Sequence, residues 1–528
     1  MTARLLFKIK PYIQPFELHL ALAELESLSR TSPKQLNNNT YQVETFTPKE
    51  IFIQNLAYWE IVTDDISYPT VQILRESTTN VVRNGVPLET LSWSMPLGAN
   101  SPLPNRRILR YGTHGIHEYR GKFFPQLVRS LINIAEVPED GLLADPMCGS
   151  GTTIVEAILS GRFGVGLDLN PLSVLMSQTK CDLLSVSPSS IILAYQSVRD
   201  RILKLQGASD NLLYFESLPA VDQHYLRLWF SEQVLSDIDQ IKRVIDNVDD
   251  IAIKNFFIIV LSNILRKVSW QKDEDLRIRK EIKPDADLDP FKEFLDDLGK
   301  SVRTVLAFLY QIQSQKIGKH FITIGNAVGL SNIWQDYSEK IDCIITSPPY
   351  ATALPYLDTD RLSLCYLGLL SHISTPKYNL SMIGNREITE KIRQSLWQTF
   401  QLNKHELPIN VIDLIAKIDS LNSNSKVGFR RRNLPVLLYK YFSDMQSVFC
   451  GMFNTLKPGS PAYIVIGNNH TIAGGEKVDI DTTSLLADCA SNIGFTEQDR
   501  IPMEMLVSRD IFKKNAVATE YILCLRKP

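Results

Sequence analysis

The stretch LLADPMCGSGTTIVEAILSGRFGVGLDLNP, residues 142–171, decides the fold. It begins with a short apolar run, 142–144, that ends at Asp145. A turn rich in Gly, Ser and Thr follows, and then residues 154–159, which favour a helix. The run 164–168 (GVGLD) predicts a second buried strand. Strand, turn, helix and strand in this order form a βαβ unit, which predicts an α/β fold with a parallel sheet.

The turn DPMCGSGTT, residues 145–153, follows the first of these strands, and the carboxyl ends of parallel strands are where such sheets bind ligands. Gly149 and Gly151 allow the backbone to approach a ligand closely. The turn is not a phosphate loop, because no lysine follows Gly151 and the acidic Asp145 would repel phosphate groups. Asp145 instead suits a cationic ligand that carries an amino acid group. The alternative is a tight strand-to-helix turn that binds nothing.

Asp168 ends the second strand. A carboxylate in this position can accept hydrogen bonds from both hydroxyls of a ribose. Alternatively, Asp168 and Asn170 cap a helix that begins at Pro171. The position of Asp168, one strand after the glycine turn, favours the ribose contact.

A second motif, TSPPY at residues 346–350, follows the apolar run DCIIT. Its two prolines fix the backbone and remove two N–H donors. The Ser347 hydroxyl and the Pro348 carbonyl are then available to accept hydrogen bonds from the amino group of a base, and Tyr350 offers a flat face for a base taken out of its helix. The alternative is a rigid turn with a core tyrosine. The glycine turn upstream favours the chemical interpretation.

The two motifs, in this order, resemble the bacterial DNA amino-methyltransferases, which make N4-methylcytosine or N6-methyladenine. The resemblance implies S-adenosylmethionine as cofactor and methyl transfer to the exocyclic amino group of a flipped base. It implies a Rossmann-like methyltransferase fold, in which one antiparallel strand joins a seven-stranded, mostly parallel sheet. Serine in the catalytic loop is more typical of the cytosine enzymes, so N4 of cytosine is favoured over N6 of adenine.

The resemblance also implies the site residues. It covers roughly residues 106–180 and 320–528, and HGIHEYRGKFFP at 114–125 resembles a family segment that packs against the methionine part of the cofactor. Asn326 follows the third expected strand, where the family more often has an acidic residue. The implied catalytic residues are Ser347, Pro348, Pro349 and Tyr350. The implied cofactor-binding residues are His117, Lys122, Phe123, Asp145, Pro146, Cys148, Gly149, Ser150, Gly151, Asp168 and Asn326. For His117 and Lys122 the alternative is an ordinary polar loop.

The remaining sequence predicts additional parts around this core. Helical periodicity is clearest at 16–29, 222–248, 252–267, 438–456 and 482–492, and further strands are expected at 321–324, 462–467 and 520–525. The Gly- and Pro-rich stretch 97–105 predicts a linker. We expect an N-terminal accessory domain of unknown role (1–105), the cofactor part of the methyltransferase domain (106–180), a mainly helical insertion (181–318) and the catalytic part (319–528). Within the last part, 371–435 is polar, is expected to be irregular, and is the candidate target-recognition region.

The charge balance excludes a uniformly basic nucleic-acid binder. The chain has 528 residues, 56 basic and 58 acidic, and a formal net charge of −2. Binding to nucleic acid therefore requires a local basic face. Arg430, Arg431 and Arg432, preceded by Phe429, are the first candidates for phosphate contacts, with a solvated charge run as the alternative. Arg277, Arg279 and Lys280, near Trp270, are a second candidate cluster.

The seven cysteines form no C-x-x-C and the eight histidines form no H-E-x-x-H, so neither a metal site nor a disulfide framework is expected. The first residues lack the apolar core of a signal peptide, and the longest apolar-rich run, 256–265, is too short to span a bilayer. A cytoplasmic enzyme with no membrane partner is therefore predicted.

Three functions remain open at this point. The first is a DNA methyltransferase that acts on double-stranded DNA, with a cognate restriction endonuclease of a restriction-modification system as a candidate partner. The second is an RNA methyltransferase, since enzymes acting on N2 of tRNA guanosine use a related loop, and residues 1–105 would then hold an RNA-binding domain. The third is a non-catalytic binding protein, which the intact motifs argue against.

Overall fold

A computed structural model describes residues 2–83, 104, 106–119, 123–205, 212–272, 279–351, 356–423, 427–504 and 519–528. Predictions for Lys122 and Arg277, and for nearly all of the 97–105 linker, fall outside these residues.

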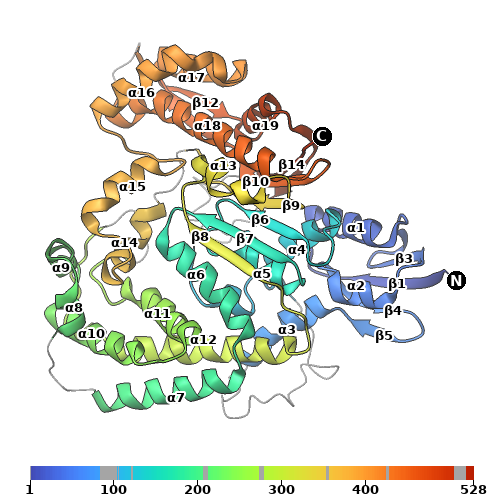
Figure 1. The fold of residues 1–528 in the computed structure, drawn as a ribbon, viewed down its shortest axis with the longest axis horizontal. Coiled ribbons are helices and arrows are strands. Elements are labelled where there is room, and N and C mark those ends of the chain that lie inside the picture. Colours follow the sequence, from blue (N-terminus) through green and yellow to red (C-terminus); the bar gives the residue numbers. More distant parts are fainter. Residues whose placement is uncertain are drawn as a thin grey trace.

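Seven of the described strands form the central sheet, in the order β13-β14-β10-β9-β6-β7-β8 (Figure 1). They are β6 (Leu142–Asp145), β7 (Phe163–Asp168), β8 (His320–Ile324), β9 (Cys343–Thr346), β10 (Pro461–Gly467), β13 (Thr496–Glu504) and β14 (Thr519–Arg526). The neighbours from β10 to β8 are parallel, whereas β14 runs antiparallel to both β10 and β13. The predicted fold class, a mostly parallel sheet with one antiparallel strand, is confirmed.

The central sheet is covered on both faces. Leu143 of β6 packs with α4 (Pro125–Ile134), while the next residue, Ala144, packs with α18 (Phe429–Thr455) and α19 (Thr482–Ile493). Successive side chains of a strand point to opposite faces, so a strand covered on both sides is apolar at every position. This explains the continuous apolar run that predicted β6.

Residues 2–83 contain a separate antiparallel sheet, in the order β2-β3-β1-β4-β5, at the right of Figure 1. Its elements are β1 (Ala3–Ile9), α1 (Pro15–Ser29), β2 (Lys34–Asn37), β3 (Thr40–Thr45), α2 (Lys49–Asn55), β4 (Trp59–Thr63), β5 (Ser67–Pro69) and α3 (Val71–Arg83). Phe7 and Trp59 belong to the same buried cluster as Leu131 of α4 and Ile522 of β14. The N-terminal sheet therefore shares its core with one face of the central sheet.

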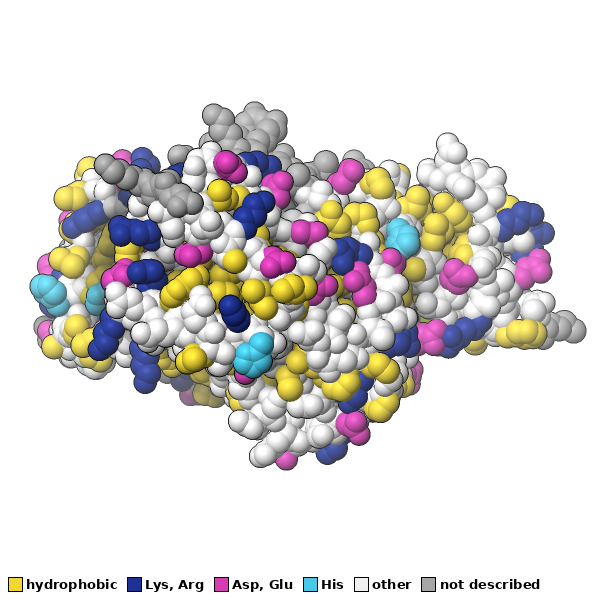
Figure 2. Space-filling view, turned by 90° about the horizontal axis from the view of Figure 1, so that it is seen from above, with side chains coloured by type: hydrophobic (Ala, Val, Ile, Leu, Met, Phe, Trp, Pro, Cys, Tyr) yellow, Lys and Arg dark blue, Asp and Glu magenta, His cyan; other side chains and the backbone are white. Residues whose placement is uncertain are grey.

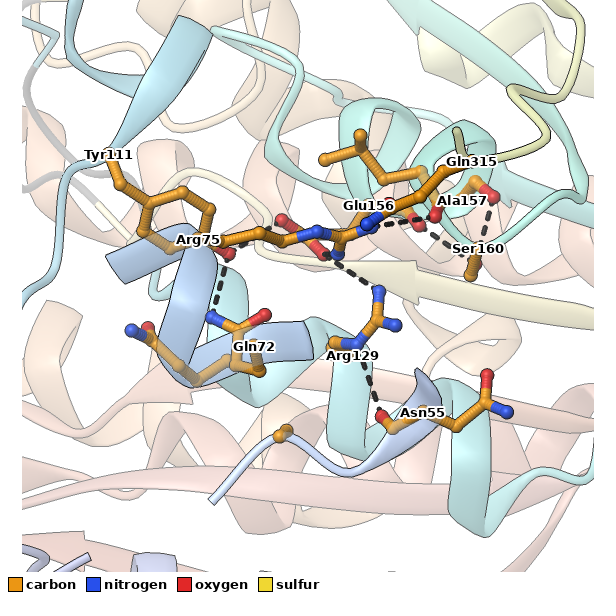
Figure 3. A network of polar contacts seen from close by, with 12 residues as sticks. Asn55, Gln72, Arg75, Tyr111, Arg129, Glu156, Ala157, Ser160 and Gln315 are labelled. Carbon is orange, nitrogen blue, oxygen red and sulfur yellow. Dashed lines mark hydrogen bonds and ion pairs between the residues drawn. The ribbon is translucent and has the colours of Figure 1, made fainter. Parts of the chain in front are cut away.

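A buried carboxylate ties the N-terminal region to the glycine turn (Figure 3). Glu156 lies in α5 (Thr152–Leu159) and is fully buried. Its Oε1 accepts a hydrogen bond from the Tyr111 hydroxyl at 2.9 Å and lies 2.9 Å from Nε2 of His114. Its Oε2 lies 3.9 Å from Arg75 of α3 and 3.7 Å from Arg129 of α4. Burial alone would raise the pKa of Glu156, but the His114 hydrogen bond and the charges of His114, Arg75 and Arg129 outweigh it and lower the pKa below its usual value.

The chain segment that connects β7 to β8 is mainly helical, although the two strands are hydrogen-bonded neighbours in the sheet. Its helices are α6 (Pro171–Asp182), α7 (Pro188–Leu205), α8 (Leu213–Ser217), α9 (Ala220–Arg227), α10 (Glu232–Asp246), α11 (Ile251–Leu265) and α12 (Pro290–Ile312), at the lower left of Figure 1. The prediction of a single helix over 222–248 is wrong, because this stretch of chain forms two helices, α9 and α10. Ser231 ends the interruption by accepting a hydrogen bond from Val234 N, a typical N-cap.

The polar region 371–435 was expected to be irregular, and this expectation is wrong. It is mostly helical and lies at the top and left of Figure 1. Val411, Ile415 and Ile418 repeat at helical spacing and are buried, a signal that the surrounding Asn and Ser residues obscured. The remaining elements are α13 (Leu330–Ile333), α14 (Tyr356–Tyr366), α15 (Thr375–Ser381), α16 (Glu390–Asn403), α17 (Ile409–Ser423), β11 (Asn469–Ala473) and β12 (Glu476–Ile480).

Helix α18 begins nine residues before its predicted start at 438. It therefore contains Pro435, which lies upstream of the predicted start. Within the described residues, no helix has both the length and the apolarity to cross a membrane.

Candidate active site

The glycine turn connects β6 to α5 and requires glycine at two positions. Gly149 has a φ of +48° and Gly151 a φ of +84°, in the left-handed region that favours glycine. A Cβ on Gly149 would lie 3.0 Å from the ring of Tyr119, and one on Gly151 would lie 2.7 Å from Oγ of Ser177. Tyr119, which belongs to the upstream segment quoted above, therefore packs directly against the turn.

Asp168 lies at the carboxyl end of β7, beside this turn. Its Oδ2 accepts a hydrogen bond from Gly149 N, and its Oδ1 accepts one from Asn170 N, both at 2.8 Å. Burial raises the pKa of its carboxyl to about 6. The cap of α6 comes from Asn170, whose side chain accepts a hydrogen bond from Leu172 N. The Asp168 carboxylate thus orders the glycine turn and does not itself cap α6.

Asp145 lies underneath the turn and connects it to the second motif. Its side chain is buried, and Oδ1 accepts hydrogen bonds from the Thr346 hydroxyl at 2.6 Å and from Met147 N at 3.1 Å. The Thr153 hydroxyl donates to the carbonyl of Ile345 at 3.0 Å. Burial raises the pKa of the Asp145 carboxyl to about 7. These bonds fix the glycine turn against β9, the strand that carries the S-P-P-Y loop.

The S-P-P-Y loop, 347–350, is held from two further sides. Gly384 packs against it with a φ of +76°, and a Cβ there would lie 2.9 Å from the carbonyl oxygen of Tyr350. The Asn469 side chain donates a hydrogen bond to the carbonyl of Ala351 at 3.2 Å. The loop is therefore supported from segments about 35 and 120 residues downstream, neither of which has a recognisable motif.

One cavity, of about 380 Å³, joins the two motifs. The predicted residues that line it are Phe123, Pro146, Cys148, Gly149, Ser150, Asp168, Asn326, Ser347, Pro348, Pro349 and Tyr350. Residues that were not predicted as site residues also line it, namely Tyr119, Phe124, Leu127, Met147, Thr152, Leu169, Asn170, Ala327, Leu357, Met382, Ile383, Val465, Met503 and Glu520. Tyr119 and Phe124 lie in the quoted upstream segment, whereas Met503 and Glu520 come from strands whose sequence carries no chemical signal.

Three predicted cofactor-binding residues are not among the lining residues. Asp145 lies beneath the turn, and Gly151 faces Ser177 of α6. His117 is buried, and its Nε2 lies 3.0 Å from the Ser262 hydroxyl of α11. His117 thus contacts the helical insertion.

A wide groove lies beside this cavity and shares Met382 with it. Arg430 and Arg431, at the start of α18, line the groove together with Phe429. Arg432 is exposed but does not line it. The other basic residues of the groove are Arg361, Arg386 and His372. The surface seen from above mixes dark-blue and magenta side chains, so the basic character is local (Figure 2).

The second predicted basic cluster lies elsewhere, around Trp270. Lys280 lies over the Trp270 ring, with Nζ 4.8 Å from its centroid, and the backbone N–H of Lys272 donates to the carbonyl of Arg279 at 2.9 Å. These residues line neither the cavity nor the groove.

Comparisons with known proteins agree with this geometry. The family model described as "RMKL-like, methyltransferase domain" matches residues 117–166. The chain is 28% identical to the type II methyltransferase M.MvaI of Kocuria varians, over 67% of this chain and 77% of that protein. It is 22% identical to the type II methyltransferase M.BsoBI of Geobacillus stearothermophilus, over 74% and 81%. The chain is thus similar to type II methyltransferases along most of its length, and it is an S-adenosylmethionine-dependent DNA methyltransferase.

A much shorter match exists to a tRNA (guanine(10)-N2)-dimethyltransferase of Methanocaldococcus jannaschii. It is 38% identical but covers 10% of this methyltransferase and 14% of the tRNA enzyme. The matches to the two type II enzymes cover most of this methyltransferase and most of each relative, whereas the match to the tRNA enzyme covers a short segment of both.

The cavity of this methyltransferase fits S-adenosylmethionine. Its lining contains groups that would suit the parts of that molecule: a strand-end carboxylate, Asp168, for the ribose hydroxyls, the amide of Asn326 for the purine, and Phe123, from the upstream segment, for the methionine part. The backbone of the glycine turn, which lines the cavity, would suit the methionine part, because Gly149 presents no side chain to the cavity.

Proposed function

We propose that this methyltransferase modifies the exocyclic amino group of a base flipped out of double-stranded DNA, with N4 of cytosine favoured over N6 of adenine. The observation that carries the proposal is the single cavity that the glycine turn lines together with Ser347, Pro348, Pro349 and Tyr350. Serine in this loop supports cytosine, following the resemblance to the cytosine enzymes.

Bound S-adenosylmethionine supplies an electrophilic methyl group, and the residues of this chain prepare the amino group that receives it. The Ser347 hydroxyl and the Pro348 carbonyl accept hydrogen bonds from the two N–H groups of the base. These bonds draw the nitrogen lone pair out of conjugation with the ring, so that the nitrogen becomes nucleophilic. Tyr350 provides the stacking face that replaces the neighbouring bases.

No covalent bond between enzyme and base is needed in this reaction. Cys148 is the cysteine in the cavity lining, and burial raises the pKa of its thiol well above the usual value. A thiol with a raised pKa provides little thiolate and is a poor nucleophile. This supports amino methylation over methylation of a ring carbon, which requires an attacking cysteine.

Arg430 and Arg431 are proposed as phosphate contacts that hold the duplex in the groove, beside the cavity that receives the base. Arg430 is exposed and forms an ion pair with Glu387 at 2.9 Å, so this pair must open or shift when phosphate binds. The shared wall at Met382 supports this arrangement, because it puts the groove next to the cavity.

The first experiment measures transfer of labelled methyl groups to plasmid DNA and to tRNA, followed by digestion to nucleosides and mass analysis. The expected product is N4-methylcytosine in DNA. N6-methyladenine would move the proposal to adenine. Label in tRNA alone would replace it with the RNA alternative, which the short tRNA-enzyme match supports. Label in neither would contradict the proposed activity.

A second experiment tests the groove. Arg430→Ala/Arg431→Ala should weaken DNA binding and reduce the slope of log K against log salt by about 1–2, since each phosphate contact contributes about 0.9. The matched control is Arg199→Ala, an exposed arginine of α7 that also pairs with a carboxylate. Unchanged affinity and slope in the double variant would remove these arginines from the interface.

A further inference from the structure

A glutamate on the antiparallel strand β14 contacts the tyrosine of the S-P-P-Y loop. The Tyr350 hydroxyl donates a hydrogen bond to Oε1 of Glu520, and both side chains line the cavity. The two residues are 170 positions apart, and neither sequence motif includes Glu520.

The direction of β14 explains why Glu520 reaches this point. Parallel strands end at the ligand side of the sheet, but β14 is antiparallel and therefore begins there. Glu520 is the second residue of β14, opposite Gly467 at the end of β10 and Met503 near the end of β13. Burial raises the pKa of its carboxyl, and the hydrogen bond from Tyr350 acts in the opposite direction.

We propose that Glu520 is a positioning residue, which holds the Tyr350 hydroxyl so that the aromatic ring is fixed as the stacking face for the flipped base. The inference rests on the proposed function, because it concerns the base that this site receives. Two prolines fix the backbone before Tyr350, yet the side chain keeps its own rotations about χ1 and χ2. A hydrogen bond at the far end of the ring removes that freedom before the base arrives.

Support from the backbone side makes this second anchor effective. Gly384 lies against the carbonyl of Tyr350, where a Cβ would come within 2.9 Å. The backbone of Tyr350 is thus held at one end and its hydroxyl at the other. The ring between them is partly buried beside the cavity.

A double-mutant cycle tests the proposal. Tyr350→Phe removes the hydroxyl but keeps the ring, and Glu520→Ala removes the acceptor. Each should lower kcat/KM for DNA by roughly tenfold, as expected for loss of a hydrogen bond to a charged group. If Glu520 acts only through Tyr350, the double variant should be no slower than either single variant, within about twofold.

The pH dependence gives a readout that a purely structural role would not change. The carboxylate form of Glu520 is the better acceptor, so wild-type turnover should fall as this group is protonated. This acid limb should disappear in Tyr350→Phe as well as in Glu520→Gln. The affinity for S-adenosylmethionine, measured by calorimetry, should stay within twofold in every variant. The control is Glu497→Ala, an exposed glutamate at the other end of β13, which should behave as wild type.

Each outcome decides the proposal. A further loss when Glu520→Ala is added to Tyr350→Phe would show that Glu520 touches the base itself, and this would overturn the positioning role. Full activity of Glu520→Ala would also overturn the proposal, because the carboxylate would then not be needed. If Glu520→Ala does not fold, Glu520→Gln takes its place in the cycle. Absence of transfer by the wild type contradicts the proposed function instead, so the two failures are distinguishable.

Discussion

Glu156→Gln removes the negative charge at the centre of the buried network in Figure 3 while keeping the size of the side chain. The guanidinium groups of Arg75 and Arg129 then remain buried without their counter-charge, since these side chains are only 1% and 3% exposed. The variant amide retains one oxygen that can accept the hydrogen bond from Tyr111.

The expected loss follows from this geometry. Removal of one partner from a buried ion pair typically destabilises a protein by about 3–5 kcal/mol. Here the ion-pair distances are long, 3.7 and 3.9 Å, and one hydrogen-bond acceptor is kept. We therefore expect a decrease in the free energy of unfolding near the lower end, about 3 kcal/mol at pH 7.5.

Urea unfolding of the full chain without cofactor, followed from pH 4 to pH 8, provides the measurement. The pKa of Glu156 is lowered in the folded protein. The contribution of its carboxylate to the free energy of unfolding is therefore fully present above pH 4.5 and is lost only as the pH falls further. Glu156→Gln should therefore be less stable than the wild type at every pH from 5 to 8.

Glu24→Gln is the matched control, because Glu24 is equally buried but its pKa is raised, mainly by burial, from 4.5 to about 7. Ionisation of Glu24 therefore destabilises the wild type as the pH rises from about 4.5 to 7. Glu24→Gln should gain stability relative to wild type across this range, by roughly 3 kcal/mol. Equal losses in both variants at pH 7.5, or a loss below 1 kcal/mol in Glu156→Gln, would refute the reasoning.

Three further predictions concern the cavity. Gly384→Ala should lower kcat roughly tenfold with unchanged cofactor affinity, because its Cβ would meet the Tyr350 carbonyl at 2.9 Å; steady-state kinetics with calorimetry test this. Gly149→Asp should abolish S-adenosylmethionine binding, because the turn needs a φ of +48° and a Cβ would crowd Tyr119; unchanged calorimetric binding by a folded variant would contradict it. Tyr350→Ala should reduce methyl transfer to DNA by tenfold to a hundredfold through loss of stacking worth about 1–3 kcal/mol, and full activity would exclude a stacking role.

The sequence predicted the part of the site that local chemistry dictates. Gly149, Asp168 and the loop 347–350 each follow an apolar strand, and the βαβ order brings their ends to one edge of the sheet. The predicted strand ranges agree with β6, β7, β8, β9, β10 and β14 to within one or two residues.

Residues that reach the site through tertiary packing could not be found in this way. Met382 and Gly384 lie in a segment whose helical neighbours were taken for irregular chain, because its polar composition masked the apolar spacing. Glu520 looks like an ordinary strand residue, and its role follows only from the antiparallel direction of β14. Asp145 was expected to meet the ligand, but its carboxylate bonds to Thr346, a pairing across 201 residues that no local pattern encodes.

The shared core of the N-terminal sheet also bears on how the chain is made. Phe7 is synthesised more than 500 residues before Ile522, yet the two belong to one buried cluster. The N-terminal sheet must therefore wait with an apolar surface uncovered while the chain between these two residues is synthesised. A nascent chain that stops before Thr519 lacks the strand that pairs with both β10 and β13, so it would expose that surface permanently and become a target for chaperones and proteases.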